Sequence, residues 1–239
     1  MKRLLFALAT SGLLLGVAAS ADVFPTLPHA ASNYIPYGAS AGGNPSTMHQ
    51  VFDKKLFIDR LGGQPIARID SIGFAPGLNG QYLSNVALRL GYTSRTPGVA
   101  GPVGLSIPTP GGGGTPNAQG AMSDFFINPT YAPPPFVNFG PNNFQMVIDG
   151  TDFDYDTTLG WNLLVEIVSN ADLNSGTIDL HVSRSAGSAE ASRAYSTQRF
   201  GNAESPTTAT RMDVKFIGVP EPTSMILLVA GLAALIRRR

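Results

Sequence analysis

The chain has 239 residues, a formal net charge of zero, and charged side chains at only 13% of its positions. So low a charge density excludes a nucleic-acid-binding protein, which needs a basic surface against the phosphates. A hydrophobic content of 43% excludes disorder driven by charge, and the absence of cysteine excludes disulfides, zinc–thiolate sites and cysteine nucleophiles.

The N-terminal end has the three parts of a secretory signal peptide. Residues 1–3 are Met-Lys-Arg, an apolar core follows, and residues 19–21 form a small-x-small exit before polarity begins. The apolar core is shorter than the roughly 20 residues that a bilayer span needs. We therefore predict a signal peptide over residues 1–21, which signal peptidase recognises through Ala19 and Ala21 and removes by cleavage after Ala21.

Residues 22–48 are rich in proline and glycine, and we interpret them as an N-terminal loop segment. Within them, residues 38–42 match the G-x-S-x-G pattern that surrounds a hydrolase nucleophile, here Ser40. That pattern works only on a sharp turn between a strand and a helix. Pro36 before it and Pro45 after it oppose such a turn, so a loop is the favoured interpretation.

Alternating apolar residues predict strands along the rest of the chain. In the first half, residues 66–74 are expected to form a strand with Ile72 and Phe74 on its inner side, and residues 84–92 a second one. Between residues 97 and 117 the chain is so rich in glycine and proline that we expect a long flexible loop.

The second half has the clearer alternation. Strands are predicted at residues 144–148, 161–167, 178–183 and 211–216, and the second and third of these are expected to form a hairpin. Trp161 is expected in the core, with Asn162 and Glu166 on the opposite face of the strand. Seven or eight such strands with turn-rich links predict an all-β fold, an antiparallel β-sandwich of jelly-roll type over residues 49–218. The signal peptide and a C-terminal apolar helix would flank this ectodomain.

The C-terminal end also has three parts. A Pro-Glu-Pro triplet at residues 220–222 is followed by an uncharged apolar run at residues 225–236 and by three arginines. We predict a transmembrane helix at about residues 224–236, with the arginines held on the cytoplasmic side. The apolar run is short for a span, which suits a segment that awaits a processing enzyme.

These parts, in this order, resemble the PEP-CTERM sorting signal of Gram-negative bacteria, here over residues 219–239. The resemblance implies a chain that is exported, anchored in the inner membrane, processed by a transpeptidase-like exosortase and delivered to the cell envelope, outer surface or medium. It also implies an association with exopolysaccharide or biofilm. The residues that it implies for recognition are Pro220, Glu221, Pro222, Arg237, Arg238 and Arg239. A plain membrane anchor behind a proline-rich linker is the alternative.

A second resemblance lies inside the predicted ectodomain. Residues 48–57, 69–74 and 153–167 are similar to segments of the sandwich ectodomains that often carry this sorting tail. This similarity implies a fold and no activity.

The densest acidic cluster suggests a metal site. In an extended segment Asp152, Asp154 and Asp156 would share one face, with Phe153 and Tyr155 directed into the core. Three neighbouring carboxylates repel one another, and a hard cation such as Ca²⁺ would relieve the repulsion. A calcium site is therefore one hypothesis and a solvated strand edge the other. The Asn/Asp-rich residues 170–176 are a second candidate, with a hairpin turn as the alternative.

Three functions remain open from the residues alone. The first is a non-catalytic protein of the envelope or matrix, and the second is a carbohydrate- or calcium-binding module. A secreted hydrolase is disfavoured because no nucleophile–base pair is recognisable, so we predict no catalytic residue and no resident cofactor other than the possible calcium ion. The three histidines, His29, His49 and His181, lack metal-ligand spacing and are expected at the surface or in turns.

Overall fold

The protein is described from a computed structural model, which describes residues 20–23, 33–37, 46–61, 65–75, 83–99, 104–108, 117–131, 144–169, 178–184, 190–196, 210–212 and 214–220. The signal-peptide core, residues 38–42 and 170–176, and the predicted helix at about residues 224–236 lie outside this part. Within the described part, no helix is both long and apolar enough to cross a membrane.

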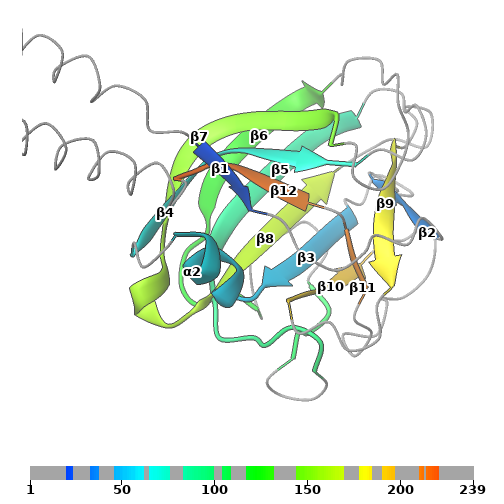
Figure 1. The fold of residues 1–239 in the computed structure, drawn as a ribbon. Helices are drawn as coiled ribbons and strands as arrows, with labels where there is room; N and C mark the ends of the chain where they lie inside the picture. Colours follow the sequence, from blue (N-terminus) through cyan, green and yellow to red (C-terminus); the bar gives the residue numbers. More distant parts are fainter. Residues whose placement is uncertain are drawn as a thin grey trace, which may run out of the picture.

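Twelve strands, paired antiparallel in three sheets, build the described part of the chain (Figure 1). The five-stranded sheet has the order β10 (Ala191–Ser196), β3 (Ser46–Phe52), β8 (Asn162–Ser169), β5 (Leu83–Thr93) and β6 (Ser123–Tyr131). The four-stranded sheet has the order β1 (Ser20–Val23), β12 (Val214–Pro220), β4 (Ile66–Phe74) and β7 (Met146–Asp156). The three-stranded sheet consists of β11 (Thr210–Met212), β9 (Ile178–Arg184) and β2 (Asn33–Tyr37).

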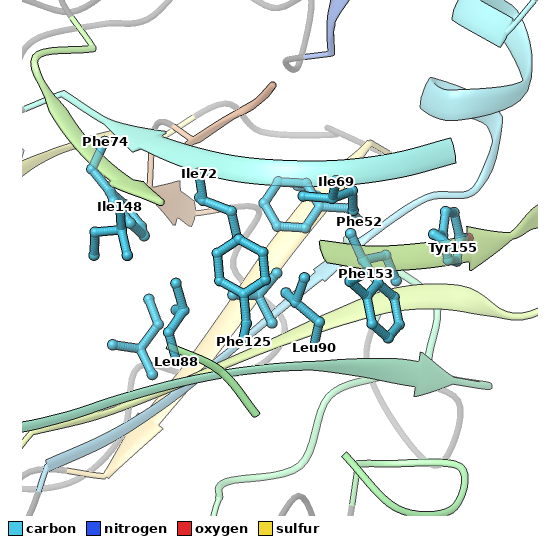
Figure 2. Close-up of a cluster of buried hydrophobic side chains, with 14 of the residues drawn as sticks. Phe52, Ile69, Ile72, Phe74, Leu88, Leu90, Phe125, Ile148, Phe153 and Tyr155 are labelled. Atoms are coloured by element: carbon cyan, nitrogen blue, oxygen red, sulfur yellow. The ribbon is translucent and has the colours of Figure 1, made fainter. Parts of the chain in front are cut away.

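The main core lies between the four- and five-stranded sheets. Figure 2 shows Ile72 and Phe74 of β4 on one side of it and Leu88 and Leu90 of β5 on the other. Phe125 of β6 lies between them. Burying each such side chain stabilises the fold by roughly 1.5–3 kcal/mol. The expected all-β class is therefore confirmed, and so are the inner positions of Ile72 and Phe74.

An irregularity in β4 sets which of its residues face the core. Ala67 and Ile69 are buried, the register with β7 then shifts between Ile69 and Ser71, and Ile72 and Phe74 are buried in the following stretch. Between the partners of Ile69 and Ser71, β7 has three residues, Gly150 to Asp152, where β4 has only Asp70, so the extra residues belong to β7. Asp70 lies at this shift and is not part of the inward series.

β7 passes close to β6 at Gly150. A Cβ atom at this position would lie 2.5 Å from the carbonyl oxygen of Phe125. Glycine thus allows the edge strand of one sheet to approach the edge strand of the other, which closes this side of the core.

Helix α2 (Lys55–Leu61) follows β3 directly. The Asp53 carboxylate accepts a hydrogen bond from the Lys55 amide at 2.7 Å, as a helix-capping side chain does. The helix buries Leu56 and Phe57, and the Phe57 ring meets Tyr155 edge-on with ring centroids 4.8 Å apart.

Several sequence-based expectations about pairing are wrong. The strands at residues 161–167 and 178–183 do not form a hairpin: β8 lies between β3 and β5, whereas β9 pairs with β2 and β11. The strand predicted at residues 211–216 is two strands, β11 and β12, in different sheets. Alternation reports which face of a strand is buried, but it does not identify the neighbouring strand.

The sequence also missed secondary structure. The expected loop segment of residues 22–48 contains β2 and the start of β3, and neither β6 nor β10 was predicted. β6 and β10 are edge strands, and β6 in particular has an irregular burial pattern that includes few buried residues. Trp161 is half-buried ahead of β8 and is not part of the main core cluster, while Leu163, Val165 and Ile167 are.

Candidate functional site

The two predicted processing sites lie on neighbouring strands at the edge of the four-stranded sheet. β1 pairs antiparallel with β12, so that Ser20 is opposite Pro220 and Ala21 is opposite Val219 (Figure 1). Among the predicted recognition residues the structure thus brings Ala21 and Pro220 close together. Ala19, Glu221, Pro222 and Arg237–Arg239 lie outside the described residues.

β12 is held by different strands along its length. Its first four residues, Val214 to Ile217, pair with β4. Val219 and Pro220 pair with β1 instead. Pro220 has no amide hydrogen and cannot donate to a ladder, which is why proline is found at strand ends and on edge strands.

The acidic cluster of β7 has the predicted alternation. Asp152 and Asp154 are exposed and Asp156 is half-buried, whereas Phe153 and Tyr155 are buried in the core. Burial raises the pKa of the Tyr155 hydroxyl, which donates a hydrogen bond to the Trp161 carbonyl at 2.7 Å.

Two of the three carboxylates in the calcium hypothesis have protein partners. Asp154 accepts a two-pronged hydrogen bond from Arg68, with Nε–Oδ1 and Nη2–Oδ2 distances of 2.8 and 3.0 Å. This hydrogen bond and the charge of Arg68 lower the pKa of Asp154. Asp156 caps the short helix η2 (Thr157–Leu159), accepting from the amide and the hydroxyl of Thr158 at 2.8 and 2.6 Å.

No group of three or more His, Asp or Glu side chains among the described residues could hold a metal ion. Among the described residues, Asp70 has an unsatisfied carboxylate oxygen: its Oδ1 atom is buried and has no hydrogen-bond partner. Burial, followed by repulsion from Asp152, raises the pKa of Asp70.

A buried polar network, which the sequence patterns did not predict, lies on the outer face of the five-stranded sheet. His49 of β3, Glu166 of β8, Arg89 of β5 and Asp124 of β6 are successive cross-strand partners in one row. His49 and Glu166 are both fully buried, which corrects the expected surface or turn position of His49, whereas Glu166 lies on the face opposite the core-facing residues of β8 as expected. Buried charged groups of this kind are found where they are paired.

The contacts of Asn117 identify which ring nitrogen of the neutral His49 side chain carries the hydrogen. The Ser106 amide donates to Asn117 Oδ1 at 2.8 Å, which identifies the other amide atom of Asn117 as the NH₂ group. That group donates to the Ser106 carbonyl at 2.7 Å and to His49 Nδ1 at 2.8 Å. Nδ1 is therefore the acceptor, and His49 Nε2 carries the hydrogen that it donates to Glu166 Oε2 at 2.8 Å.

Arg89 completes the network on the other side of Glu166. It donates from Nη1 to Glu166 Oε1 at 2.8 Å and from Nε to Asp124 Oδ1 at 2.7 Å. Burial opposes the charge of Arg89, but the hydrogen bonds to Glu166 and Asp124 outweigh it and raise its pKa. The row thus runs from the buried His49 to the Asp124 side chain, which is 63% exposed.

This network attaches part of the predicted flexible loop to the sheet. Leu105 packs with Val51 and Leu164 on the same face, Ala118 and Met122 pack against them, and Thr93 donates to the Asn117 carbonyl at 2.6 Å. The described residues 104–108 and 117–122 therefore cover the outer face of the sheet. Both ring nitrogens of His49 thus have hydrogen-bond partners within the protein.

Comparison with known proteins identifies the C-terminal end. Residues 218–239 match the family model described as the PEP-CTERM protein-sorting motif. No curated protein matches the chain, and no solved structure does. The chain thus carries a PEP-CTERM sorting motif, and that motif implies an exported protein with a cell-surface location that is sorted and processed by an exosortase.

Proposed function

We propose that the protein is a non-catalytic component of the cell envelope or extracellular matrix, in which a β-sandwich of jelly-roll type is delivered by its sorting tail. The observation that carries this proposal is the position of the motif. Its match begins at Gly218, inside β12, so the sorting signal starts in the last strand of the folded domain. The folded domain and the sorting signal are therefore continuous in the chain, as expected for a protein whose own tail directs its sorting.

The proposed route uses both ends of the chain. Signal peptidase cleaves after Ala21, and the apolar run at residues 225–236 then anchors the domain in the inner membrane, with Arg237–Arg239 on the cytoplasmic side. An exosortase recognises Pro220–Pro222 and removes the tail. The released domain takes its place at the outer surface, in association with exopolysaccharide.

A structural role is supported by the way the polar groups of the domain are used. Glu166, Arg89 and His49 are joined to one another and to the covering loop. The charged pair of Asp154 and Arg68 joins β7 to β4. Each of these groups is engaged in holding strands together, and no observation favours the calcium- or carbohydrate-binding alternative over this one.

Mass spectrometry of the mature protein from its native host tests the proposal. We expect an N-terminus at Asp22 and a C-terminus near Pro220. The matched variant replaces Pro220, Glu221 and Pro222 with alanine, and it should retain the residues up to Arg239. A wild-type protein that keeps Arg239 at the surface would contradict the proposal and would indicate a plain anchor.

The binding alternative has its own test. A thermal shift of the purified protein on addition of calcium or of members of a glycan panel would support a binding module. We expect no shift with calcium, because Asp154 and Asp156 already have partners.

A further inference from the structure

The sorting motif begins in β12. The strand that pairs with the end of β12 is β1, and signal-peptide cleavage would remove part of β1. Val219 and Pro220 pair with Ala21 and Ser20, and β1 is the edge strand of its sheet. Cleavage after Ala21 would remove Ser20 and Ala21 from β1. Only Asp22 and Val23 would remain, and Val23 pairs with Phe216, further back along β12.

β4 does not take over as a partner for these residues. Its pairing with β12 ends at Ile217, opposite Ser71. The next residue of β4, Asp70, lies beyond this pairing, at the register shift between β4 and β7. Val219 and Pro220 are therefore paired through β1.

We propose that removal of the signal peptide frees the start of the sorting motif, so that the N-terminal cleavage precedes and promotes removal of the C-terminal tail. The first reaction is hydrolysis of the Ala21–Asp22 peptide bond: water adds across it, and the products are a carboxylate at Ala21 and an amino group at Asp22. This reaction supplies the substrate of the tail-removing enzyme. The inference rests on the proposed sorting function and adds an order to its two steps.

The physical basis is that a processing enzyme acts on the open form of a paired segment. The backbone hydrogen bonds between β1 and the end of β12 would together lower the open population about tenfold to thirtyfold. The uncleaved chain should therefore lose its tail more slowly by about that factor.

The test uses the full chain in its native host, with pulse–chase labelling to measure the rate of tail loss and mass spectrometry to identify both termini. The blocking variant, Ala19→Phe with Ala21→Phe, prevents signal-peptide cleavage while leaving residues in β1 that suit a strand. A second variant keeps Ala19→Phe and has Ser20→Pro and Ala21→Pro. Ser20 and Ala21 pair in unbroken register with Pro220 and Val219, and successive strand residues direct their amide hydrogens to opposite sides, so one of the two prolines removes a donor from the ladder with β12.

The matched control keeps Ala19→Phe and has Ser20→Thr and Ala21→Ser, which preserves the ability to pair. We expect the blocked chain to lose its tail at least about tenfold more slowly than wild type. The proline variant should recover the wild-type rate, and the serine–threonine control should stay slow.

Two results would overturn the inference and leave the sorting function standing. One is tail loss at the wild-type rate in the blocked chain. The other is an equal delay in the blocked chain and the proline variant, which would assign the delay to the retained signal peptide and not to pairing. A wild-type chain that never loses its tail would overturn the proposed function together with the inference.

Discussion

His49 Nε2 donates a hydrogen bond of 2.8 Å to Glu166 Oε2, and both side chains are fully buried although they are separated by 117 positions in the chain. The direction of this bond follows from Asn117, which donates to the other ring nitrogen. Two adjacent strands and a distant loop segment are thus joined through one imidazole. The first two predictions concern this network.

Glu166→Gln should destabilise the protein by about 3 kcal/mol. The amide would keep the size of the carboxylate, but its NH₂ group would face either His49 Nε2–H or Arg89, both of which are donors. Equilibrium urea denaturation of the purified protein measures the loss as a lower midpoint at an unchanged slope. Asp124→Asn is the control, because it breaks only the exposed end of the row and should cost less than about 1 kcal/mol. Equal losses of stability in Glu166→Gln and Asp124→Asn would contradict the prediction, because the buried contacts of Glu166 would then stabilise the fold no more than the exposed contact of Asp124 does.

Asn117→Asp should loosen the covering loop. The substitution places a carboxylate oxygen where the NH₂ group donates to His49 Nδ1 and the Ser106 carbonyl, and the unmet acceptors cost about 1–3 kcal/mol. Hydrogen exchange at the Ser106 amide, which donates to Asn117, reports this change locally. Gln119→Ala, at an exposed neighbouring side chain, should leave exchange unchanged. Unaltered protection in Asn117→Asp would show that the loop is held by its apolar contacts alone.

Gly150→Ala should destabilise the contact between β6 and β7 by about 1–3 kcal/mol. The added Cβ would lie 2.5 Å from the backbone oxygen of Phe125, which cannot move as a flexible side chain can. Thermal unfolding provides the measurement. Gly120→Ala is the comparison: its φ of 94° opposes alanine, but no atom lies within 4 Å of the new Cβ. A loss no greater than that of Gly120→Ala would refute the steric explanation.

Asp70→Asn should stabilise the protein at pH 7 but not at pH 3. Since the pKa of Asp70 is raised in the folded state, the stability linked to this group is fully present below its unfolded pKa and is lost as the pH rises through the folded pKa. Removing the charge should raise the Tm by about 1–3 °C at pH 7.

Asp154→Asn should change the stability at pH 7 in the opposite direction. The pKa of Asp154 is lowered, so its contribution is present above the unfolded pKa and is lost as the pH falls through the folded one. This variant should therefore have a slightly lower Tm than wild type at pH 7 and an equal one at low pH. Because the pair with Arg68 is exposed, the difference should stay below about 1 kcal/mol. Changes in Tm of the same sign at pH 7 in Asp70→Asn and Asp154→Asn would refute the opposite pKa directions of these two carboxylates.

Local patterns predicted the strand positions that have one buried face. Ile72, Phe74, Leu88, Leu90, Leu163 and Val165 all face the core as their alternation indicated. The same patterns did not reveal the edge strands β6 and β10. His49 was misjudged because nothing local in the sequence indicates that a distant loop segment covers it.

The sequence by itself determined the C-terminal sorting motif and the class of fold, since a sorting signal is a contiguous run of residues and half-buried strands have a period of two. Only the tertiary structure decided which strands are neighbours, that residues 104–108 and 117–122 cover the outer face of the five-stranded sheet, and that Ala21 lies opposite Val219. These relationships join residues far apart in the chain. They depend on which surfaces meet after collapse, and no local period encodes that.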